Sequence, residues 1–146
     1  MLRAGAVLLT LWAGVHLVIA LGIVIMVLGL GQNAPALMIL YGDIQGKGVD
    51  TRALATIDAL AALGNGWRAA MCALSLTIIW TGLLRRAAWA FWSLAVCVCF
   101  VQAVDFASGS FYQHRSLLDA VPSLLPLAGI IFAAIGVFRF QKSVES

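Results

Sequence analysis

The sequence predicts an all-α, integral membrane fold: a four-helix transmembrane bundle running up, down, up and down, with a short interfacial helix in the first loop. Of its 146 residues, 63% are hydrophobic and 10% are charged, whereas a soluble domain averages about 45–50% and about 25%. The mean hydropathy is +1.03. One membrane span needs about 20 mostly apolar residues, so the chain has room for about four spans and no further domain. This composition excludes an ordinary cytosolic enzyme, a disordered chain and a nucleic-acid-binding domain.

The first span is predicted over residues 4–30, which contain no charged residue and one histidine, His16. Gly14, Gly22 and Gly29 recur near one helical face, where small residues let another backbone approach closely. The apolar run exceeds the roughly 7–15 residues of a secretory signal, so we expect it to be retained as a span.

The loop that follows contains the short apolar segment 36–41, which ends at Tyr41. Six apolar residues cannot cross a bilayer, so we expect an interfacial helix there, with Tyr41 at the level of the lipid headgroups. The second span is predicted over 64–84, after a helical extension over 51–63 that lies outside the membrane core. Arg85 and Arg86 mark a very short turn, which makes the second and third spans antiparallel neighbours.

The third span is predicted over 87–106 and is followed by a polar loop over 107–118. The fourth span is predicted over 119–138, with a kink at Pro126, and the remaining residues form a polar tail. Together these elements make a single transmembrane domain over residues 1–146.

The distribution of positive charge predicts the orientation. Five basic residues flank the spans tightly on one side of the membrane: Arg3, Arg85, Arg86, Arg139 and Lys142. The positive-inside rule places that side in the cytoplasm, so we expect a multi-pass protein of the inner (plasma) membrane with both termini cytoplasmic. Tryptophans at 12, 80, 89 and 92 predict an aromatic belt towards the same side.

Helix rise predicts a layer of polar groups near the outer edge of the membrane. At about 1.5 Å per residue, polar residues of the second, third and fourth spans fall about 24–30 Å from the cytoplasmic ends, and His16 falls about 20 Å from Arg3. The predicted layer consists of His16, Asn65, Arg68, Gln102, Asp105 and Asp119. It forms either an outward-facing ligand pocket or side chains that reach to water and pair locally.

Arg68 has one acidic residue at its own depth on a neighbouring span, namely Asp105. We therefore predict that the Arg68 guanidinium points into the bundle and bonds to the Asp105 carboxylate, with Gln102 or Asn65 as a second partner. This structural pair would tie the second and third spans together at their outer ends.

No catalytic or metal-binding set emerges from the sequence, and we expect no cofactor. The one other histidine, His114, lies in a predicted loop, which disfavours a haem held between two histidines of one chain. Haem ligation or quinone binding by His16 stays open beside a structural role in helix packing. The three cysteines, Cys72, Cys97 and Cys99, lie in apolar stretches and are expected as buried free thiols.

Two short motifs carry a resemblance to a known family. Residues 64–68 (Gly-Asn-Gly-Trp-Arg) open the second span, and Arg85, Arg86 and Trp89 open the third. With the span count and the loop after a long charge-free span, the chain resembles the DoxX-like small four-helix membrane proteins. The resemblance implies the four-span fold and brings no catalytic residue with it.

The sequence predicts a non-enzymatic function, as an accessory or structural subunit of a larger membrane complex. The expected partners are the lipid bilayer and other membrane-protein subunits or a second copy of the chain, and no nucleic acid. The alternative is a small binding or transport protein whose outward-facing polar pocket takes a lipid, a quinone or a small solute.

Overall fold

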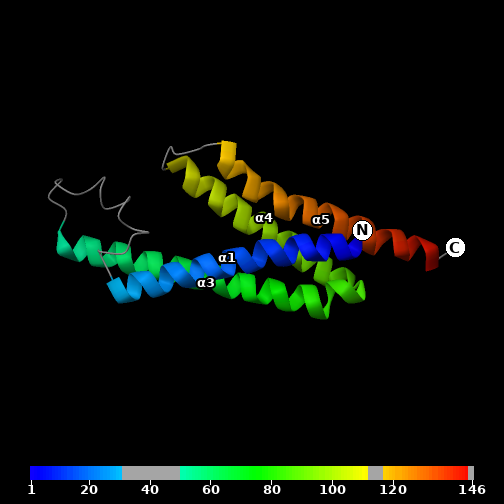
Figure 1. The fold of residues 1–146 in the computed structure, drawn as a ribbon, viewed down its shortest axis with the longest axis horizontal. Helices are drawn as coiled ribbons and strands as arrows, with labels where there is room; N and C mark the ends of the chain where they lie inside the picture. The colour runs from blue at the N-terminus through cyan, green and yellow to red at the C-terminus, as the bar shows by residue number, and fades with distance from the viewer. Residues whose placement is uncertain (31–49, 112–116, 145–146) are drawn as a thin grey trace. The chain divides into compact units, whose positions relative to one another are not determined.

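The computed structural model describes residues 1–30, 50–111 and 117–144, and these residues form helices and short turns with no strand (Figure 1). Its elements are α1 (Leu2–Leu30), α3 (Thr51–Thr81), the 3-10 helix η2 (Leu83–Arg85), α4 (Ala88–Phe111) and α5 (Leu117–Val144). The predicted all-α fold with four long helices is therefore confirmed for these residues. The interfacial helix expected at 36–41 lies outside them.

The helix ends differ from the predicted spans. Helix α3 stops at Thr81, whereas α4 continues to Phe111 and α5 runs on to Val144. The polar loop predicted over 107–118 and the polar tail after 138 are thus helical over most of their length. Hydropathy marks the apolar part of a helix, while backbone hydrogen bonding carries a helix on into polar sequence, which explains the error.

The described chain divides into two compact units. One unit contains residues 1–15 and 71–146, and the other contains residues 16–70. The first is called the four-helix unit below, because it holds the start of α1, the end of α3, η2, α4 and α5. The second is called the hairpin unit, because it holds the end of α1 and the start of α3.

In the hairpin unit, α1 packs against α3 around the buried Val27. The partly buried apolar residues around it are Ile23, Met26, Leu54, Ile57, Ala61 and Ala62. Helix α3 begins with a side-chain cap: the Arg52 backbone N–H donates to Asp50 Oδ1 at 2.8 Å. Such a cap satisfies one of the backbone donors that a helix start leaves unpaired.

In the four-helix unit, α3 and α4 are antiparallel neighbours. Ser75 lies 3.3 Å from Cys97 between their Oγ and Sγ atoms. A Cβ atom on Gly82 would lie 2.6 Å from the Ala90 Cβ. Because the residue number rises in α3 while it falls in α4, the two helices run in opposite directions, as the short turn at Arg85 and Arg86 predicts.

Helices α1 and α5 are also antiparallel neighbours in this unit, and glycines let their backbones approach. A Cβ on Gly5 would lie 2.6 Å from the Ala133 backbone nitrogen, and one on Gly136 would lie 2.5 Å from the Leu2 Cβ. Phe91 of α4 stacks edge-on against Phe138 of α5, with ring centroids 5.2 Å apart. The glycine contacts, in which the residue number rises in α1 as it falls in α5, make these two helices antiparallel.

The glycines predicted to permit close packing are not the ones that do so. A Cβ on Gly14, Gly22 or Gly29 would meet no described atom within 4 Å. Among the described residues, the close approach of helices falls instead on Gly5 and on the glycines of α5.

Two helices are long and apolar enough to span a membrane, judged over the described residues: Leu2–Leu30 and Thr51–Arg85. Shorter apolar stretches lie in the described parts of α4 and α5, at Ala88–Val104 and Leu124–Arg139.

Candidate functional site

The predicted polar layer is divided between the two units. His16, Asn65 and Arg68 are half-buried residues of the hairpin unit. The Asn65 side-chain amide donates to the Ala61 backbone oxygen of its own helix at 2.9 Å. Neither His16 nor Arg68 is without an interaction partner. Each of these three residues therefore makes an interaction in the described structure.

The remaining residues of that layer belong to the four-helix unit. Gln102 of α4 is half-buried. Asp105 and Asp119 lie on helices, but their side chains are outside the described part of the structure. The outer polar pocket and the bond between Arg68 and Asp105 accordingly stay predictions.

Arg68 does lie on the less exposed face of its helix. Ala61, Asn65 and Arg68 are half-buried and are spaced by four and three residues, so they share one face of α3. Trp67, the neighbour of Arg68, is exposed. The direction of the Arg68 guanidinium stays a prediction.

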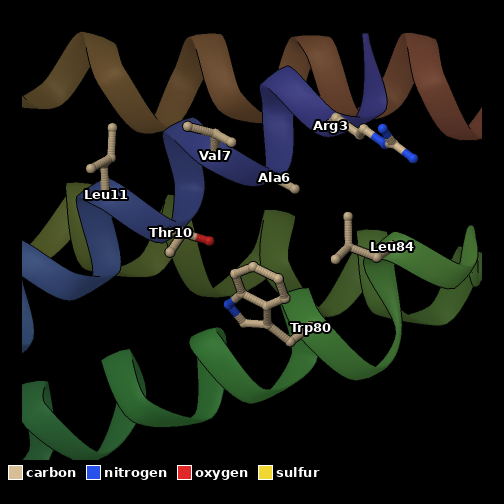
Figure 2. Close-up of a pocket in the computed structure, with 7 residues that line it drawn as sticks. All are labelled: Arg3, Ala6, Val7, Thr10, Leu11, Trp80 and Leu84. Carbon is tan, nitrogen blue, oxygen red and sulfur yellow. The ribbon is translucent and has the colours of Figure 1, made fainter.

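The four-helix unit contains a half-open cavity between the start of α1 and the end of α3, called the groove below (Figure 2). Its volume is about 340 Å³, within the range of roughly 300–1,000 Å³ typical of small-molecule sites. On one side it is lined by Arg3, Ala6, Val7, Thr10 and Leu11, and on the other by Trp80 and Leu84. Apart from Arg3 and Thr10, every lining side chain is apolar or aromatic.

Thr10 places a hydroxyl in the wall of the groove. Figure 2 shows its oxygen directed towards the space above the Trp80 ring. The Thr10 Oγ1 atom is buried and has no hydrogen-bond partner in the described structure. A buried hydroxyl without a partner costs about 1–3 kcal/mol, so this atom has an unused hydrogen-bonding capacity beside the groove.

A second cavity, called the vestibule below, adjoins the groove and has a volume of about 590 Å³. It is lined by Met1, Leu2, Arg3, Leu84 and Arg86. Arg3 and Leu84 line both cavities. The two cavities are therefore neighbours that share part of their lining, and the groove is mostly apolar while the vestibule contains two arginines.

The turn between α3 and α4 positions Arg86 at the vestibule. Gly82 allows the turn to pack tightly, because a Cβ there would lie 2.9 Å from the Trp89 ring. After η2, Arg86 adopts a left-handed conformation with φ 60°, and its backbone N–H donates to the Leu83 oxygen at 2.8 Å. The short turn thus brings the Arg86 side chain to the same cavity as Arg3.

Sequence reasoning missed this site. It interpreted Arg3 and Arg86 as markers of membrane orientation and attached no role to Ala6 or Thr10. One usable signal was present: Thr10 is the first hydroxyl residue of a charge-free span that begins directly after an arginine. The other wall, with Trp80, comes from a distant part of the chain and could not be paired with α1 from hydropathy.

The aromatic belt stays a prediction, and three of its four tryptophans have the exposure that it requires. Trp80, Trp89 and Trp92 are exposed, with Trp80 at 62%. The fourth member, Trp12, is only 1% exposed and belongs to the core of the four-helix unit, so its assignment to the belt is wrong. The expectation of three buried thiols needs a similar correction, because Cys99 is exposed and Cys97 is half-buried.

Within the part of the chain that the structure describes, no group of three or more His, Cys, Asp or Glu residues could hold a metal ion. No family model matches the chain, and neither does a curated protein or a solved structure. The resemblance to the DoxX-like proteins therefore stays a prediction.

Proposed function

We propose that this chain is a multi-pass integral membrane protein, with four transmembrane helices and both termini in the cytoplasm, that binds one membrane amphiphile in its groove. An amphiphile has an apolar chain and a polar head, which are the two chemistries that the groove and the vestibule offer. The observation that carries the proposal is that Arg3 and Leu84 line both cavities, which places the apolar groove beside the cationic vestibule.

The membrane location is supported by how little of α1 is buried. Only 17% of its most apolar 18-residue window is buried inside the structure. Large apolar side chains of α1 are exposed, with Val18 71% and Leu28 75% exposed. The core helix of a soluble protein would bury such residues, whereas a lipid-facing helix leaves them exposed.

The binding of an apolar chain is supported by the wall of the groove. From Arg3 to Leu11 the helix rises about 12 Å, and the side chains along this length are apolar except at the arginine and at Thr10. A chain lying along α1 would cover Ala6 and the Trp80 ring. A water held beside the chain would supply the missing partner of the Thr10 hydroxyl.

A matched pair of variants tests the proposal. Ala6 is buried and lines the groove, whereas Ala4 is exposed on the same helix and does not line it. We expect Ala6→Phe to fill the groove and Ala4→Phe to leave it open. The full-length chain in a neutral detergent is titrated with phosphatidylcholine, and bound lipid is counted by native mass spectrometry.

The proposal expects one discrete lipid adduct on the wild-type chain and on Ala4→Phe. It expects at least a tenfold weaker adduct on Ala6→Phe. Equal binding by the three proteins, or a graded series of adducts without a preferred first one, would show only non-selective annular lipid and would overturn the proposal.

A second candidate function is the accessory subunit of a larger membrane complex, working without catalysis. The glycine-bearing face of α1 favours it, since Gly14, Gly22 and Gly29 leave room for another backbone. On this account the chain purifies from its native membrane with a partner in fixed stoichiometry, and Gly22→Leu releases that partner while Gly64→Leu, an open glycine of α3, does not. Retention of the partner by Gly22→Leu would contradict it.

A further inference from the structure

Two arginines from different parts of the chain line one cavity. Arg3 comes from the first turn of α1, and Arg86 follows η2. Both residues are exposed. The residues that line the groove and the vestibule include no aspartate or glutamate, so the cavity walls themselves carry positive charge only.

The charge of Arg3 is not neutralised by the protein as described. The Arg3 guanidinium makes no ion pair with any side chain in the described ranges, and the groove beside it is apolar. Because Arg3 is exposed, an anion from outside the chain can reach its guanidinium. Because Arg3 also lines the groove, such an anion would sit at the head of whatever apolar chain the groove holds.

We infer that the vestibule selects an anionic phospholipid, whose phosphate is held between Arg3 and Arg86 while one acyl chain lies in the groove. This inference rests on the proposed amphiphile binding and adds the class of headgroup. Arginine presents several N–H donors in a planar fork that matches phosphate oxygens. The apolar continuation of the site selects a lipid, since a free phosphate ion would leave the groove empty.

The predicted orientation fits this assignment. Arg3, Arg85, Arg86 and Arg139 flank the spans on the side predicted to be cytoplasmic, where anionic lipids attract basic residues near the membrane surface. Each such residue contributes about a fivefold preference for an anionic over a neutral surface. Two arginines acting on one headgroup therefore give a preference of about 25-fold.

The test compares phosphatidylglycerol with phosphatidylcholine by native mass spectrometry of the full-length chain in neutral detergent. Arg3→Gln removes one charge, and Arg86→Asn removes the other while keeping a residue that tolerates the left-handed backbone. Arg85→Gln is the matched control, because Arg85 is an exposed arginine next to Arg86 that does not line the vestibule. Inorganic phosphate is added as a competitor.

We expect the wild-type chain and Arg85→Gln to prefer phosphatidylglycerol by about 25-fold. Arg3→Gln and Arg86→Asn each lose about fivefold of that preference, and the double variant loses all of it. Phosphatidylcholine still binds the two single variants and the double variant. Inorganic phosphate does not displace the lipid.

Other outcomes overturn the inference and can be told apart. Equal affinity of the wild-type chain for both lipids, with both abolished by Ala6→Phe, would refute the headgroup assignment and leave the proposed function standing. A loss in Arg85→Gln as large as in Arg86→Asn would show a diffuse charge effect instead of a site. Displacement of the lipid by inorganic phosphate, or by an acidic peptide at equal concentration, would assign the two arginines to a different anion.

Discussion

Gly5 of α1 lies so close to Ala133 of α5 that a Cβ atom on the glycine would come 2.6 Å from the alanine backbone nitrogen. The Gly129 backbone oxygen would lie 2.8 Å from the same Cβ. Real Cβ atoms do not approach backbone this closely, so the contact requires glycine at this position. It sets the distance between α1 and α5, and with it the placement of Arg3 and Ala6 on the groove.

Replacement of Gly5 by leucine should separate α1 from α5. We expect Gly5→Leu to lower the free energy of unfolding by about 1–3 kcal/mol, because backbone atoms cannot yield as a flexible side chain can. Gly14→Leu is the matched control on the same helix, since a Cβ there meets nothing within 4 Å. Thermal unfolding in detergent, followed by circular dichroism, measures both variants. Equal losses would contradict the close α1–α5 contact.

Arg86 carries a backbone conformation that glycine adopts at lower cost. Its φ of 60° is left-handed, which costs a residue with a Cβ about 1 kcal/mol. We expect Arg86→Gly to raise the unfolding temperature slightly and Arg85→Gly, within η2, to lower it. The same unfolding measurement compares them. A loss for Arg86→Gly as large as for Arg85→Gly would show that the turn is not held as described.

The helices α3 and α4 were predicted as antiparallel neighbours from the two arginines of the turn, and hydropathy sufficed for that. The contact of α1 with α5 was not predictable in the same way. A single sequence shows that Gly5, Gly129 and Gly136 are small, but it does not show which helix each one faces. The regular spacing of Gly14, Gly22 and Gly29 was the stronger pattern, yet a Cβ at any of them would meet no described atom within 4 Å.

The candidate site was harder to predict than the fold. A polar layer can be inferred from helix rise, because depth follows from sequence distance alone. A groove made of apolar side chains from two helices gives no such signal, since Ala6, Val7 and Trp80 look like ordinary lipid-facing residues. The sequence interpretation used Arg3 and Arg86 as markers of orientation only, so their shared cavity became visible only when α1 and the α3–α4 turn were placed together.

Ser75 should stabilise the packing of α3 on α4. Its hydroxyl proton is donated to the Met71 oxygen at 2.8 Å, so its oxygen is the acceptor for the Cys97 thiol, 3.3 Å away. We expect Ser75→Ala to cost about 1 kcal/mol and the double-mutant cycle with Cys97→Ala to give a coupling of about 0.6 kcal/mol. Thr77→Ala, an exposed hydroxyl bonded within its own helix, is the control. A coupling energy of zero would show that the Ser75–Cys97 hydrogen bond does not contribute to stability.

The predicted bond between Arg68 and Asp105 can be tested on stability. If it ties the second and third spans, Arg68→Ala should cost about 1–3 kcal/mol by leaving a carboxylate unpaired. Adding Asp105→Ala should then recover part of that loss. Arg52→Ala, at an exposed position of the same helix, should have little effect. Additive losses in the double variant would reject the pair.

The measurement that tests the central claim most directly is the quenching of Trp80 fluorescence by a phospholipid with brominated acyl chains. In bilayers of unbrominated lipid, a variant with Trp80 as its single tryptophan is compared with one that keeps only Trp89, which is also exposed but does not line the groove. The account predicts that Trp80 is quenched in a saturable way at a low fraction of brominated phosphatidylglycerol, while Trp89 is quenched in proportion to that fraction. Proportional quenching of both tryptophans would mean that Trp80 meets only bulk lipid, and it would contradict a lipid-binding groove.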